Sequence, residues 1–303
     1  MRILVMGAGA IGSLLGGFLA KAGVDVVLVG RKAHMEKVRE DGLRVRSPLG
    51  GFKVRVEAHE RVDEVKGDVD LVLITVKAYD TYQAASQVKG LVAKGALPLC
   101  LQNGLGVEEE ASRALNVKVF RGVTNNGAML AEPGLVQHTG LGDTLIEAGD
   151  SRLEELVGKL KAIGLPAALT NNIAETVWAK TLVNAGINPL GAITGLRNGE
   201  LLKVGWLKEL MRMVVEEGAF IAERSGVKLA IDPVELTFKV AEATASNKNS
   251  MLQDLERGRK TEVDYINGAI ARRAEELGLE APLNRALASM VKALEQRRPR
   301  CAA

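Results

Sequence analysis

The residues with the clearest chemical signature lie near the N-terminus, in a glycine-rich segment between a short apolar run and a helical pattern. Six residues form a Gly-x-Gly-x-x-Gly pattern: Gly7, Ala8, Gly9, Ala10, Ile11 and Gly12. The first glycine of such a turn permits a tight bend, the second lets a pyrophosphate approach the backbone, and the third lets helix and strand pack closely. The N-terminus of the following helix offers N–H groups and its dipole to the anion. The segment therefore predicts a dinucleotide site, rather than a glycine-rich turn that binds nothing.

The end of the second apolar run, residues 24–29, bears on the choice of dinucleotide. An Asp or Glu at this point would accept hydrogen bonds from the ribose 2′-hydroxyl of NAD. The sequence instead continues Gly30-Arg31-Lys32, with two cations that suit a 2′-phosphate. Arg31 could otherwise face solvent or stack on adenine. These residues favour NADPH, with NADH as the alternative.

Two polar residues follow further apolar runs, at positions where ligands bind in open α/β sheets. Lys77 follows residues 71–76, and Asn103 follows residues 97–101. Each has an ordinary alternative, because lysine is common on surfaces and Asn-Gly is a frequent turn. Their occurrence at the same expected edge of a sheet favours a functional role.

A lysine and two amides recur every four residues in a mainly apolar stretch, residues 176–190. Lys180, Asn184 and Asn188 therefore fall along one side of a helix. A solvated helix face would carry more charge, so the pattern favours the floor of a cleft over a weakly amphipathic surface stripe. Pro189 disfavours the helical conformation at Asn188, which predicts a kink or break there.

Polar residues cluster twice more in the C-terminal half. Asn247 and Ser250 lie just before an apolar pair, in a pattern typical of a helix start or a loop. Glu262 and Asp264 follow in the segment 261–268, where either carboxylate would also favour a helix N-terminus. Spacing alone does not select which carboxylate is functional.

These residues need a framework, and the sequence predicts one in two parts. Short apolar runs alternate with helical patterns in the first half, which is typical of a doubly wound parallel sheet; the runs cover 3–6, 24–29, 71–76 and 97–101. An alternating stretch over residues 44–58 predicts a hairpin. Helical periodicity then dominates, with helices expected at 173–190, 203–225, 233–247, 262–277 and 283–296. The expected fold is α/β, with a Rossmann-type doubly wound sheet over residues 1–170 and an all-helical domain over residues 171–303.

Composition excludes several other classes of protein. The 303 residues are 47% hydrophobic and 25% charged, with a net charge of +3, so neither a disordered chain nor a strongly basic nucleic-acid binder is expected. Aromatic residues are 3%, too few for a platform that stacks single-stranded nucleic acid. Two cysteines and three histidines show no metal-ligand spacing, so no metal is expected.

Cys100 is expected to be a buried strand cysteine, with a redox-sensitive or ligand-sensing thiol as the alternative. With few cysteines, no signal peptide and no membrane span, the sequence predicts a cytoplasmic protein.

Taken together, these motifs resemble the ketopantoate reductase family over nearly the whole length of the chain. The glycine turn occurs in many dehydrogenases, whereas the C-terminal segments occur together in very few families. The resemblance rests on residues 7–12, 76–78, 102–104, 178–180, 184–190, 198–200, 250–254 and 261–268.

The resemblance implies a role for each candidate residue. Lys180 matches the family's catalytic lysine, which donates a proton to the substrate carbonyl oxygen, and Glu262 matches the acidic residue that binds the substrate hydroxyl. Ser250 is expected at the substrate carboxylate. Four amides match further polar residues of the substrate pocket: Asn184, Asn188, Asn198 and Asn247. Three residues match positions near the cofactor, with the first at the 2′-phosphate: Arg31, Lys77 and Asn103.

The resemblance thus implies NADPH-dependent reduction of ketopantoate to pantoate, a step toward pantothenate and coenzyme A, and it is consistent with a homodimer. A related NAD(P)-dependent 2-oxo acid or 3-hydroxy acid dehydrogenase on the same scaffold is one alternative. The other is a non-catalytic NADP(H) sensor, which the joint presence of Lys180, Asn184, Ser250 and Glu262 argues against.

Overall fold

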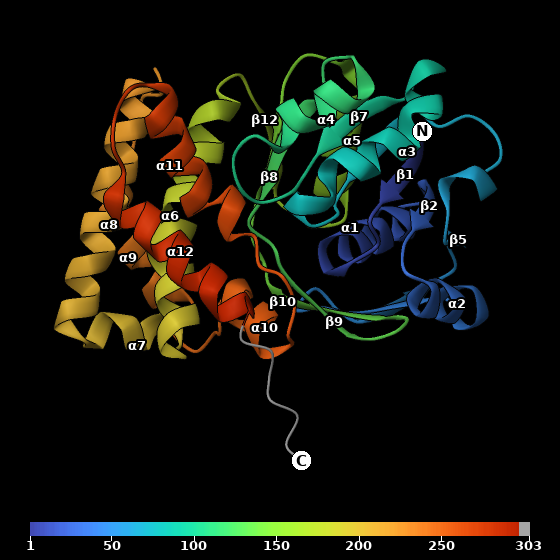
Figure 1. The fold of residues 1–303 in the computed structure, drawn as a ribbon. Coiled ribbons are helices and arrows are strands. Elements are labelled where there is room, and N and C mark those ends of the chain that lie inside the picture. Colours follow the sequence, from blue (N-terminus) through green and yellow to red (C-terminus); the bar gives the residue numbers. More distant parts are fainter. Residues whose placement is uncertain (297–303) are drawn as a thin grey trace. The chain divides into compact units, whose positions relative to one another are not determined.

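An eight-stranded sheet forms the frame of the N-terminal part of the chain, in a computed structural model that describes residues 1–296 (Figure 1). The strands follow the order β12-β11-β8-β7-β6-β1-β2-β5. Their bounds are β1 Arg2–Met6, β2 Asp25–Val29, β5 Glu57–His59, β6 Leu71–Ile74, β7 Leu97–Cys100, β8 Phe120–Thr124, β11 Thr144–Glu147 and β12 Ala167–Thr170. Neighbouring strands run parallel from β5 through β2, β1, β6 and β7 to β8, while β11 runs antiparallel to β8. This arrangement confirms the expected doubly wound sheet.

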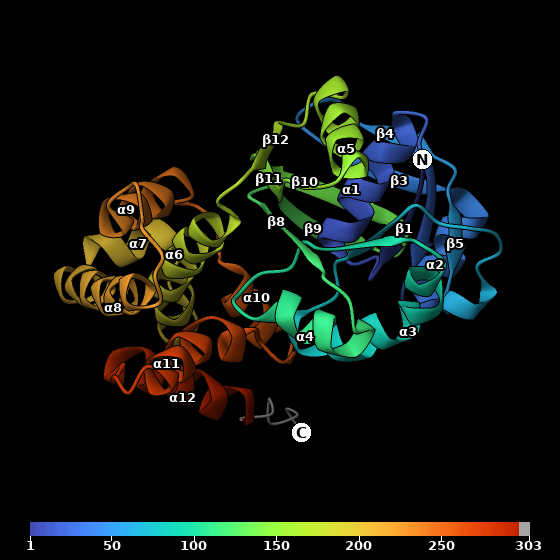
Figure 2. The same ribbon diagram turned by 90° about the horizontal axis from the view of Figure 1, so that it is seen from above.

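Helices cover both faces of this sheet, which explains why its central strands are apolar along their whole length. In Figure 2, α1 and α5 lie on one face, and α3 and α4 lie on the other. The helices are α1 Ala10–Lys21, α2 Lys32–Asp41, α3 Thr81–Ala93, α4 Val107–Leu115 and α5 Ser151–Ala162. Ile3, Leu4 and Val5 of β1 are completely buried as a result.

A second, four-stranded sheet has the order β4-β3-β10-β9 and packs against α1. Its strands are β3 Leu43–Arg46, β4 Phe52–Val54, β9 Gly127–Glu132 and β10 Leu135–Gly140. The antiparallel pairing of β3 with β4 confirms the hairpin expected from the alternating pattern. Close packing on α1 needs a glycine, because a Cβ at Gly17 would lie 2.8 Å from Val45 Cγ2.

A buried histidine of α2, His34, is hydrogen-bonded both to this sheet and to α1. The Gly134 N–H, in the turn between β9 and β10, donates to His34 Nδ1 at 2.8 Å. Because Nδ1 accepts, the proton of a neutral imidazole lies on Nε2, which donates to Ser13 Oγ of α1 at 2.9 Å. Burial lowers the pKa of His34 below its ordinary value of 6.5, which favours the neutral ring in the folded protein.

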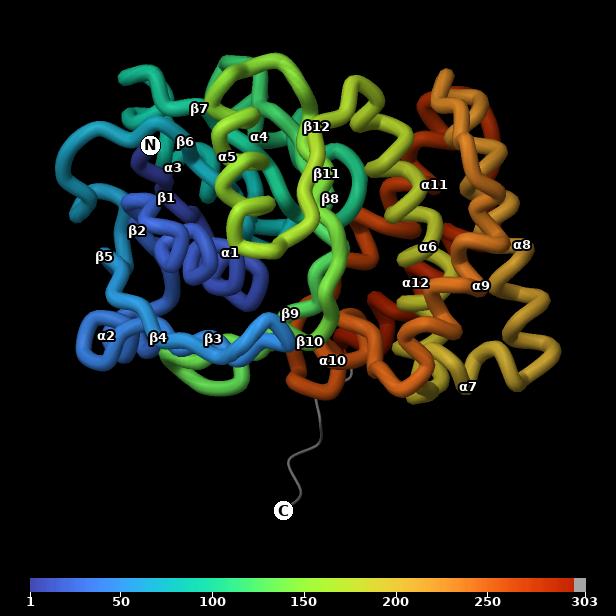
Figure 3. The backbone as a smooth tube through the Cα atoms, turned by 180° about the vertical axis from the view of Figure 1, so that it is seen from behind, coloured from blue at the N-terminus to red at the C-terminus, as the bar shows by residue number. Residues whose placement is uncertain are grey.

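The rest of the chain forms a helical unit. Its helices are α6 Ile173–Thr194, α7 Asn198–Lys203, α8 Gly205–Arg224, α9 Pro233–Ala243, α10 Ser250–Glu256, α11 Asn267–Glu276 and α12 Pro282–Gln296. Figure 3 shows α6 running alongside α8, α9 and α11. Glycines permit these close crossings. A Cβ at Gly218 of α8 would lie 2.5 Å from Leu182 of α6, and one at Gly186 of α6 would lie 2.8 Å from Val215 of α8.

Of the kink or break expected at Asn188, the break was wrong, because α6 continues as a helix through Pro189 to Thr194. Proline has no N–H, so the Ala185 carbonyl four residues earlier loses its usual helical donor. The completely buried Asn267 supplies that donor, since its Nδ2 donates to the Ala185 carbonyl at 3.1 Å. The same Nδ2 donates to Asn284 Oδ1 at 2.9 Å, which joins α6, α11 and α12. A tertiary contact therefore repairs the local defect.

Other helix bounds also differ from the expectation. The helix expected at 262–277 begins only at Asn267, after a 3-10 turn over Val263–Tyr265. The short helices α7 and α10 were not expected as separate elements.

The chain divides into two compact units. The first contains Met1–Gln102 and Val107–Ile173, and the second contains the chain from Ala174 onward together with the loop Asn103–Gly106. The loop was expected within the N-terminal domain, and its contacts, described below, account for its place in the second unit. Within residues 1–296, no helix is both long and apolar enough to cross a membrane.

Candidate functional site

The three glycines of the N-terminal turn have three different surroundings. Gly7 has a positive φ of 104°, and a Cβ there would lie 2.6 Å from Val76. A Cβ at Gly12 would lie 2.5 Å from the Gly7 carbonyl oxygen and 2.5 Å from Thr75 Oγ1. At Gly9 the nearest atom would be 3.9 Å away, and this residue is exposed. Thus Gly7 and Gly12 are required by the fold, whereas Gly9 leaves the backbone accessible from outside.

The turn fits an anionic group at the start of α1. Gly9 is the N-cap residue of α1, and no side chain caps the helix there. The N–H groups of Gly7 and Ala8 both donate to the Val29 carbonyl, at 3.0 and 2.8 Å, which fixes the turn against the end of β2. An accessible glycine backbone at an uncapped helix N-terminus is the arrangement that accepts a pyrophosphate.

The residues after β2 lie beside this turn. A Cβ at Gly30 would lie 3.0 Å from the Ala8 Cβ, so the end of β2 approaches the glycine turn closely. Arg31 is exposed and is the N-cap residue of α2. Lys32 lies 3.9 Å from Glu36 in an exposed ion pair within the same helix. Arg31 is therefore accessible to a ligand bound at the glycine turn.

Lys77 lies in the turn between β6 and α3, half-buried, as the N-cap residue of a 3-10 helix over Ala78–Asp80. Buried side chains connect this turn to the end of β7. Thr81 Oγ1 donates to the Ala78 carbonyl at 2.6 Å, and Gln102 Nε2 donates to Thr81 Oγ1 at 2.7 Å. The turn carrying Lys77 is thus hydrogen-bonded to the residue directly before Asn103.

The loop Asn103–Gly106 brings Asn103 to Glu262 within the second unit. Asn103 Nδ2 donates to Glu262 Oε2 at 3.4 Å, although the two residues are 159 positions apart. The Leu105 N–H donates to the Tyr265 carbonyl at 2.9 Å. Gly104 has a φ of +90°, and a Cβ there would collide with the Tyr265 backbone. Glu262 itself is only 6% exposed. The structure therefore joins two expected site residues to which the family resemblance gave different roles.

The lysine and the two amides of α6 keep the arrangement that their spacing predicts. Successive members are separated by about one turn, or roughly 6 Å along the axis. Lys180 and Asn184 are half-buried, and Asn188 is buried. This side of α6 is therefore not an ordinary solvated face.

The remaining polar residues lie on and before the short helices. Asn198 is buried, and its Nδ2 donates to Thr244 Oγ1 at 2.8 Å, while its N–H donates to the Asn247 carbonyl at 3.1 Å. Asn247 and Ser250 are exposed, and Ser250 begins α10. Asn198 and Asn247 are therefore neighbours.

Asn249 was not among the expected site residues. It is buried and caps α10 by accepting the Leu252 N–H on its Oδ1 at 3.0 Å. The signal was available, because asparagine is a preferred N-cap residue before an apolar helical segment.

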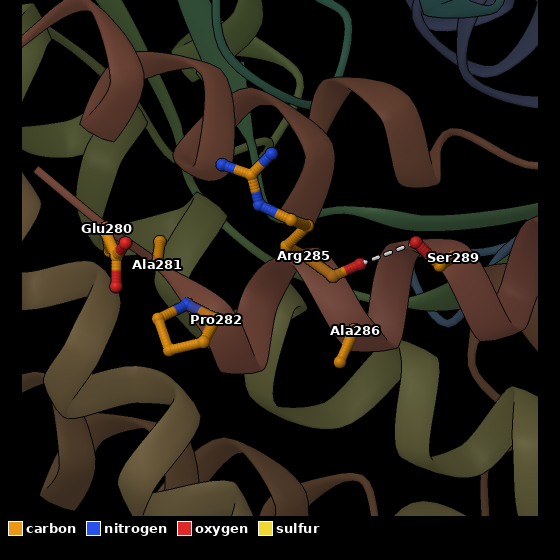
Figure 4. A pocket seen from close by; sticks show the side chains of 6 residues that line it. All are labelled: Glu280, Ala281, Pro282, Arg285, Ala286 and Ser289. Atoms are coloured by element: carbon orange, nitrogen blue, oxygen red, sulfur yellow. Dashed lines mark hydrogen bonds between the residues drawn. The ribbon is translucent and has the colours of Figure 1, made fainter.

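Surface hollows elsewhere on the helical unit do not involve the candidate residues. One of about 360 Å³ lies at the start of α12, where Ser289 Oγ donates to the Arg285 carbonyl at 3.0 Å (Figure 4). Another of about 770 Å³ lies beside Phe220 and Ile231. No cluster of three or more His, Cys, Asp or Glu side chains that could hold a metal ion occurs in the described part of the chain.

Comparison with known proteins covers almost the entire chain. A family model described as ketopantoate reductase PanE/ApbA matches residues 3–151, and the model of the C-terminal part of that family matches residues 172–295. The 2-dehydropantoate 2-reductase of Pyrococcus horikoshii is 42% identical over 97% of this chain and 98% of its own length. The 2-dehydropantoate 2-reductase of Archaeoglobus fulgidus is 41% identical, again over 97% of this chain and 98% of its own length.

Solved structures agree with this assignment. A PanE/ApbA family ketopantoate reductase from Ralstonia eutropha superimposes with a TM-score of 0.92 at 37% identity, covering 97% of this chain and 98% of that one. D-mandelate dehydrogenase, solved with NADH and anilino(oxo)acetate, gives a TM-score of 0.88 at 29% identity over the same shares. On its motifs, its fold and these matches, the chain belongs to the ketopantoate reductase family.

Proposed function

We propose that the protein reduces ketopantoate to pantoate with NADPH. The observation that carries the proposal is the buried Glu262 carboxylate, which accepts a hydrogen bond from Asn103 in the second unit. A carboxylate accepts several hydrogen bonds at once, so bonding to Asn103 is compatible with accepting one from a substrate hydroxyl. Full-length relatives named 2-dehydropantoate 2-reductase support the choice of substrate.

Lys180 is the proposed general acid. Reduced nicotinamide, when bound, supplies the hydride that reaches the carbonyl carbon of the substrate. Negative charge then develops on the carbonyl oxygen, where a protonated lysine stabilises it and donates the proton that completes the hydroxyl group. The neutral amine left behind regains a proton from solvent before the next turnover.

The other polar residues of the second unit bind and orient the substrate in this proposal. Ser250 donates a hydrogen bond to the substrate carboxylate, and Glu262 accepts one from the hydroxyl that distinguishes ketopantoate from simpler 2-oxo acids. The amides complete the polar lining: Asn184, Asn188, Asn198 and Asn247. Orientation of this kind accounts for a large part of the rate enhancement when two reactants must meet.

The first unit would hold the dinucleotide. In this proposal the glycine turn at Gly7–Gly12 receives the pyrophosphate, Arg31 pairs with the 2′-phosphate, and Lys77 serves the reacting end, as does Asn103, which belongs to the second unit. The exposed Arg31 and the absence of a carboxylate in Gly30-Arg31-Lys32 support NADPH. A lower KM for NADH than for NADPH would overturn this choice.

The activity is tested by following NADPH oxidation after addition of ketopantoate. Lys180→Ala should lower kcat/KM by about three orders of magnitude, since general acid catalysis contributes about 10²–10⁴-fold. NADPH affinity should stay close to that of the natural chain. Lys239→Ala, at an exposed lysine of α9, is the matched control and should keep full activity. Near-normal turnover by Lys180→Ala would remove this residue from the mechanism.

Glu262 is tested by its effect on substrate binding. Glu262→Ala should raise the KM for ketopantoate strongly, because the substrate hydroxyl loses its acceptor. The KM for 2-ketoisovalerate, which has no such hydroxyl, should change much less. Equal changes for the two acids would contradict the assigned contact.

A second candidate function is oxidation or reduction of another 2-hydroxy or 2-oxo acid. The similarity to D-mandelate dehydrogenase favours it, because that protein has nearly the same fold over nearly the same length. A substrate panel that includes D-mandelate with NAD and ketopantoate with NADPH separates the two. The expected homodimer and cytoplasmic location also remain predictions, and light scattering on the purified protein tests the first.

A further inference from the structure

One buried arginine contacts the chain both before and after the loop Asn103–Gly106. Arg121 lies on β8, and its side chain is only 2% exposed. Its Nη2 donates to the Gln102 carbonyl at 2.8 Å, directly before the loop. Its Nε lies 3.3 Å from Glu108 Oε2, in the first turn of α4 directly after the loop. A single guanidinium therefore contacts one residue just before this segment and one in the first turn of the helix after it.

The guanidinium donates hydrogen bonds to backbone carbonyls at the point where the pairing of β7 with β8 ends. The register of β7 with β8 stops at Cys100 opposite Arg121. Beyond that point, Arg121 Nη1 donates to the Cys100 carbonyl at 3.4 Å, and Nη2 reaches the carbonyl two residues further on. Arginine suits this task because its planar fork presents several donors in fixed directions, whereas lysine presents a single ammonium.

Holding the buried Arg121 cation beside the half-buried Glu108 carboxylate is costly, which argues for a role beyond packing. Removal of two charges from water often costs more than their attraction returns, and apolar residues of similar size are frequently as stable. Burial raises the pKa of Glu108 above its ordinary value, while the Arg121 cation acts in the opposite direction. Methionine at position 121 with leucine at position 108 would avoid the removal of either charge from water. Such a pair would leave the Gln102 carbonyl without its donor.

We propose that Arg121 is a positioning residue for the reaction. By fixing Gln102 and Glu108, it holds the loop whose Asn103 donates to Glu262 and whose Leu105 N–H donates to the Tyr265 carbonyl. Through Gln102 Nε2 and Thr81 the same anchor reaches the turn that carries Lys77. The kinetic consequence rests on the proposed function, whereas the structural consequence at the loop does not.

The chain contains a matched control for an arginine that binds carbonyls. Arg152 donates to the Gly95 carbonyl at 2.7 Å and to the Asp70 carbonyl at 3.3 Å, and it pairs with Asp150. Those carbonyls precede β7 and β6, at the opposite ends of the strands. Arg152→Met therefore removes similar interactions from the same unit without touching the loop.

The kinetic test compares Arg121→Met with Arg152→Met. Arg121→Met should lower kcat for ketopantoate by roughly 10²-fold, a loss that a misplacement of about 1 Å can cause. NADPH binding should remain close to that of the natural chain, and Arg152→Met should keep its kcat. Combining Arg121→Met with Asn103→Ala should cost less than the product of the two single losses, because the arginine acts in part through Asn103. Independent, multiplicative losses would overturn the proposal.

A double variant separates positioning from stability. Arg121→Met combined with Glu108→Leu leaves no unpaired charge, so it should fold at least as stably as Arg121→Met. It should nevertheless retain the kinetic defect, since the Gln102 carbonyl still lacks its donor. Recovery of full kcat with recovered stability would show a merely structural role and would refute the proposal.

Hydrogen exchange gives a readout that needs no substrate. The Leu105 amide is protected by its bond to the Tyr265 carbonyl, and Arg121→Met should raise its exchange rate by about tenfold or more, equivalent to about 1.4 kcal/mol of lost protection. Arg152→Met should leave it unchanged. If the natural chain reduces no ketopantoate, the proposed function fails while this comparison still decides the positioning role. Equal exchange at Leu105 in both variants would overturn the anchor itself.

Discussion

Removal of the Asn267 side chain should destabilise the helical unit through the carbonyl that Pro189 leaves without a helical donor. Asn267 Nδ2 donates to the Ala185 carbonyl at 3.1 Å and to Asn284 Oδ1 at 2.9 Å, and the residue is completely buried. Asn267→Ala takes the donor from both acceptors. Each buried acceptor left without a partner costs about 1–3 kcal/mol. The free energy of unfolding should therefore fall by at least about 2 kcal/mol.

The substitution Pro189→Ala isolates the part of this cost that belongs to Ala185. Alanine at position 189 restores an N–H that can close the i to i−4 bond to the Ala185 carbonyl. Loss of Asn267 then leaves only Asn284 without its donor. The cost of Asn267→Ala should be smaller by about 1–3 kcal/mol in this background than in the natural chain. Independent sites add to within about 0.5 kcal/mol, so the difference is measurable.

Tryptophan fluorescence during urea denaturation suits the measurement. Both tryptophans of the chain, Trp178 and Trp206, lie in the second unit. Trp178 is 7% exposed and Trp206 is 86% exposed, so the signal reports mainly the transfer of Trp178 of α6 into water. Unfolding of the sheet-bearing unit contributes no tryptophan of its own. The fluorescence change therefore reports unfolding of the second unit, which contains the helices that Asn267 joins.

Thr261→Val is the matched control. Thr261 is buried in the same unit, and its Oγ1 donates to Glu295 Oε1 at 2.6 Å, away from α6. Its cost should be the same with and without Pro189→Ala. If the cost of Asn267→Ala were also the same in both backgrounds, the explanation of the unbroken helix would be wrong.

Four other positions have measurable consequences. Because burial lowers the pKa of His34, the unfolded chain binds its proton first as the pH falls below about 6.5, and stability should decline there by up to about 1.4 kcal/mol per pH unit. His34→Gln should reduce this slope in denaturation at pH 7 and pH 5, and an unchanged slope would contradict the assignment. Burial raises the pKa of the Cys100 thiol to about 12, so in a Cys301→Ser background, which removes a cysteine outside the described residues, thiol reagents should label Cys100 only after unfolding. Gly9→Ala should keep the Tm but weaken NADPH binding by roughly tenfold, whereas Gly12→Ala should cost about 1–3 kcal/mol of stability, and normal NADPH affinity in Gly9→Ala would exclude backbone contact with the cofactor.

The sequence predicted the architecture of this protein because its signals are local. Continuous apolar runs identified the central strands, and a glycine pattern between strand and helix identified the turn at Gly7–Gly12. The four-residue spacing of Lys180, Asn184 and Asn188 fixed their common side of α6. In each case the periodicity of the backbone alone relates sequence position to direction.

Some local signals gave the wrong element. Pro189 predicted a kink or break, but a distant amide satisfies the carbonyl that the proline leaves without a donor, and the helix is not broken. The carboxylates of residues 261–268 predicted a helix N-terminus, yet α11 begins only at Asn267. Local propensity is overridden wherever tertiary contacts satisfy the same backbone groups.

Only the tertiary structure decided which polar residues meet. Asn103 reaches Glu262 across 159 positions, and Arg121 contacts the residues on both sides of the same loop. No period in the sequence encodes such pairs, because each depends on where two separate elements pack. The sequence by itself thus determined the central strands, the glycine turn and the family, while packing decided the surroundings of Glu262 and the continuity of α6. The reason is physical: a buried polar group takes whichever partner the fold brings within hydrogen-bond distance.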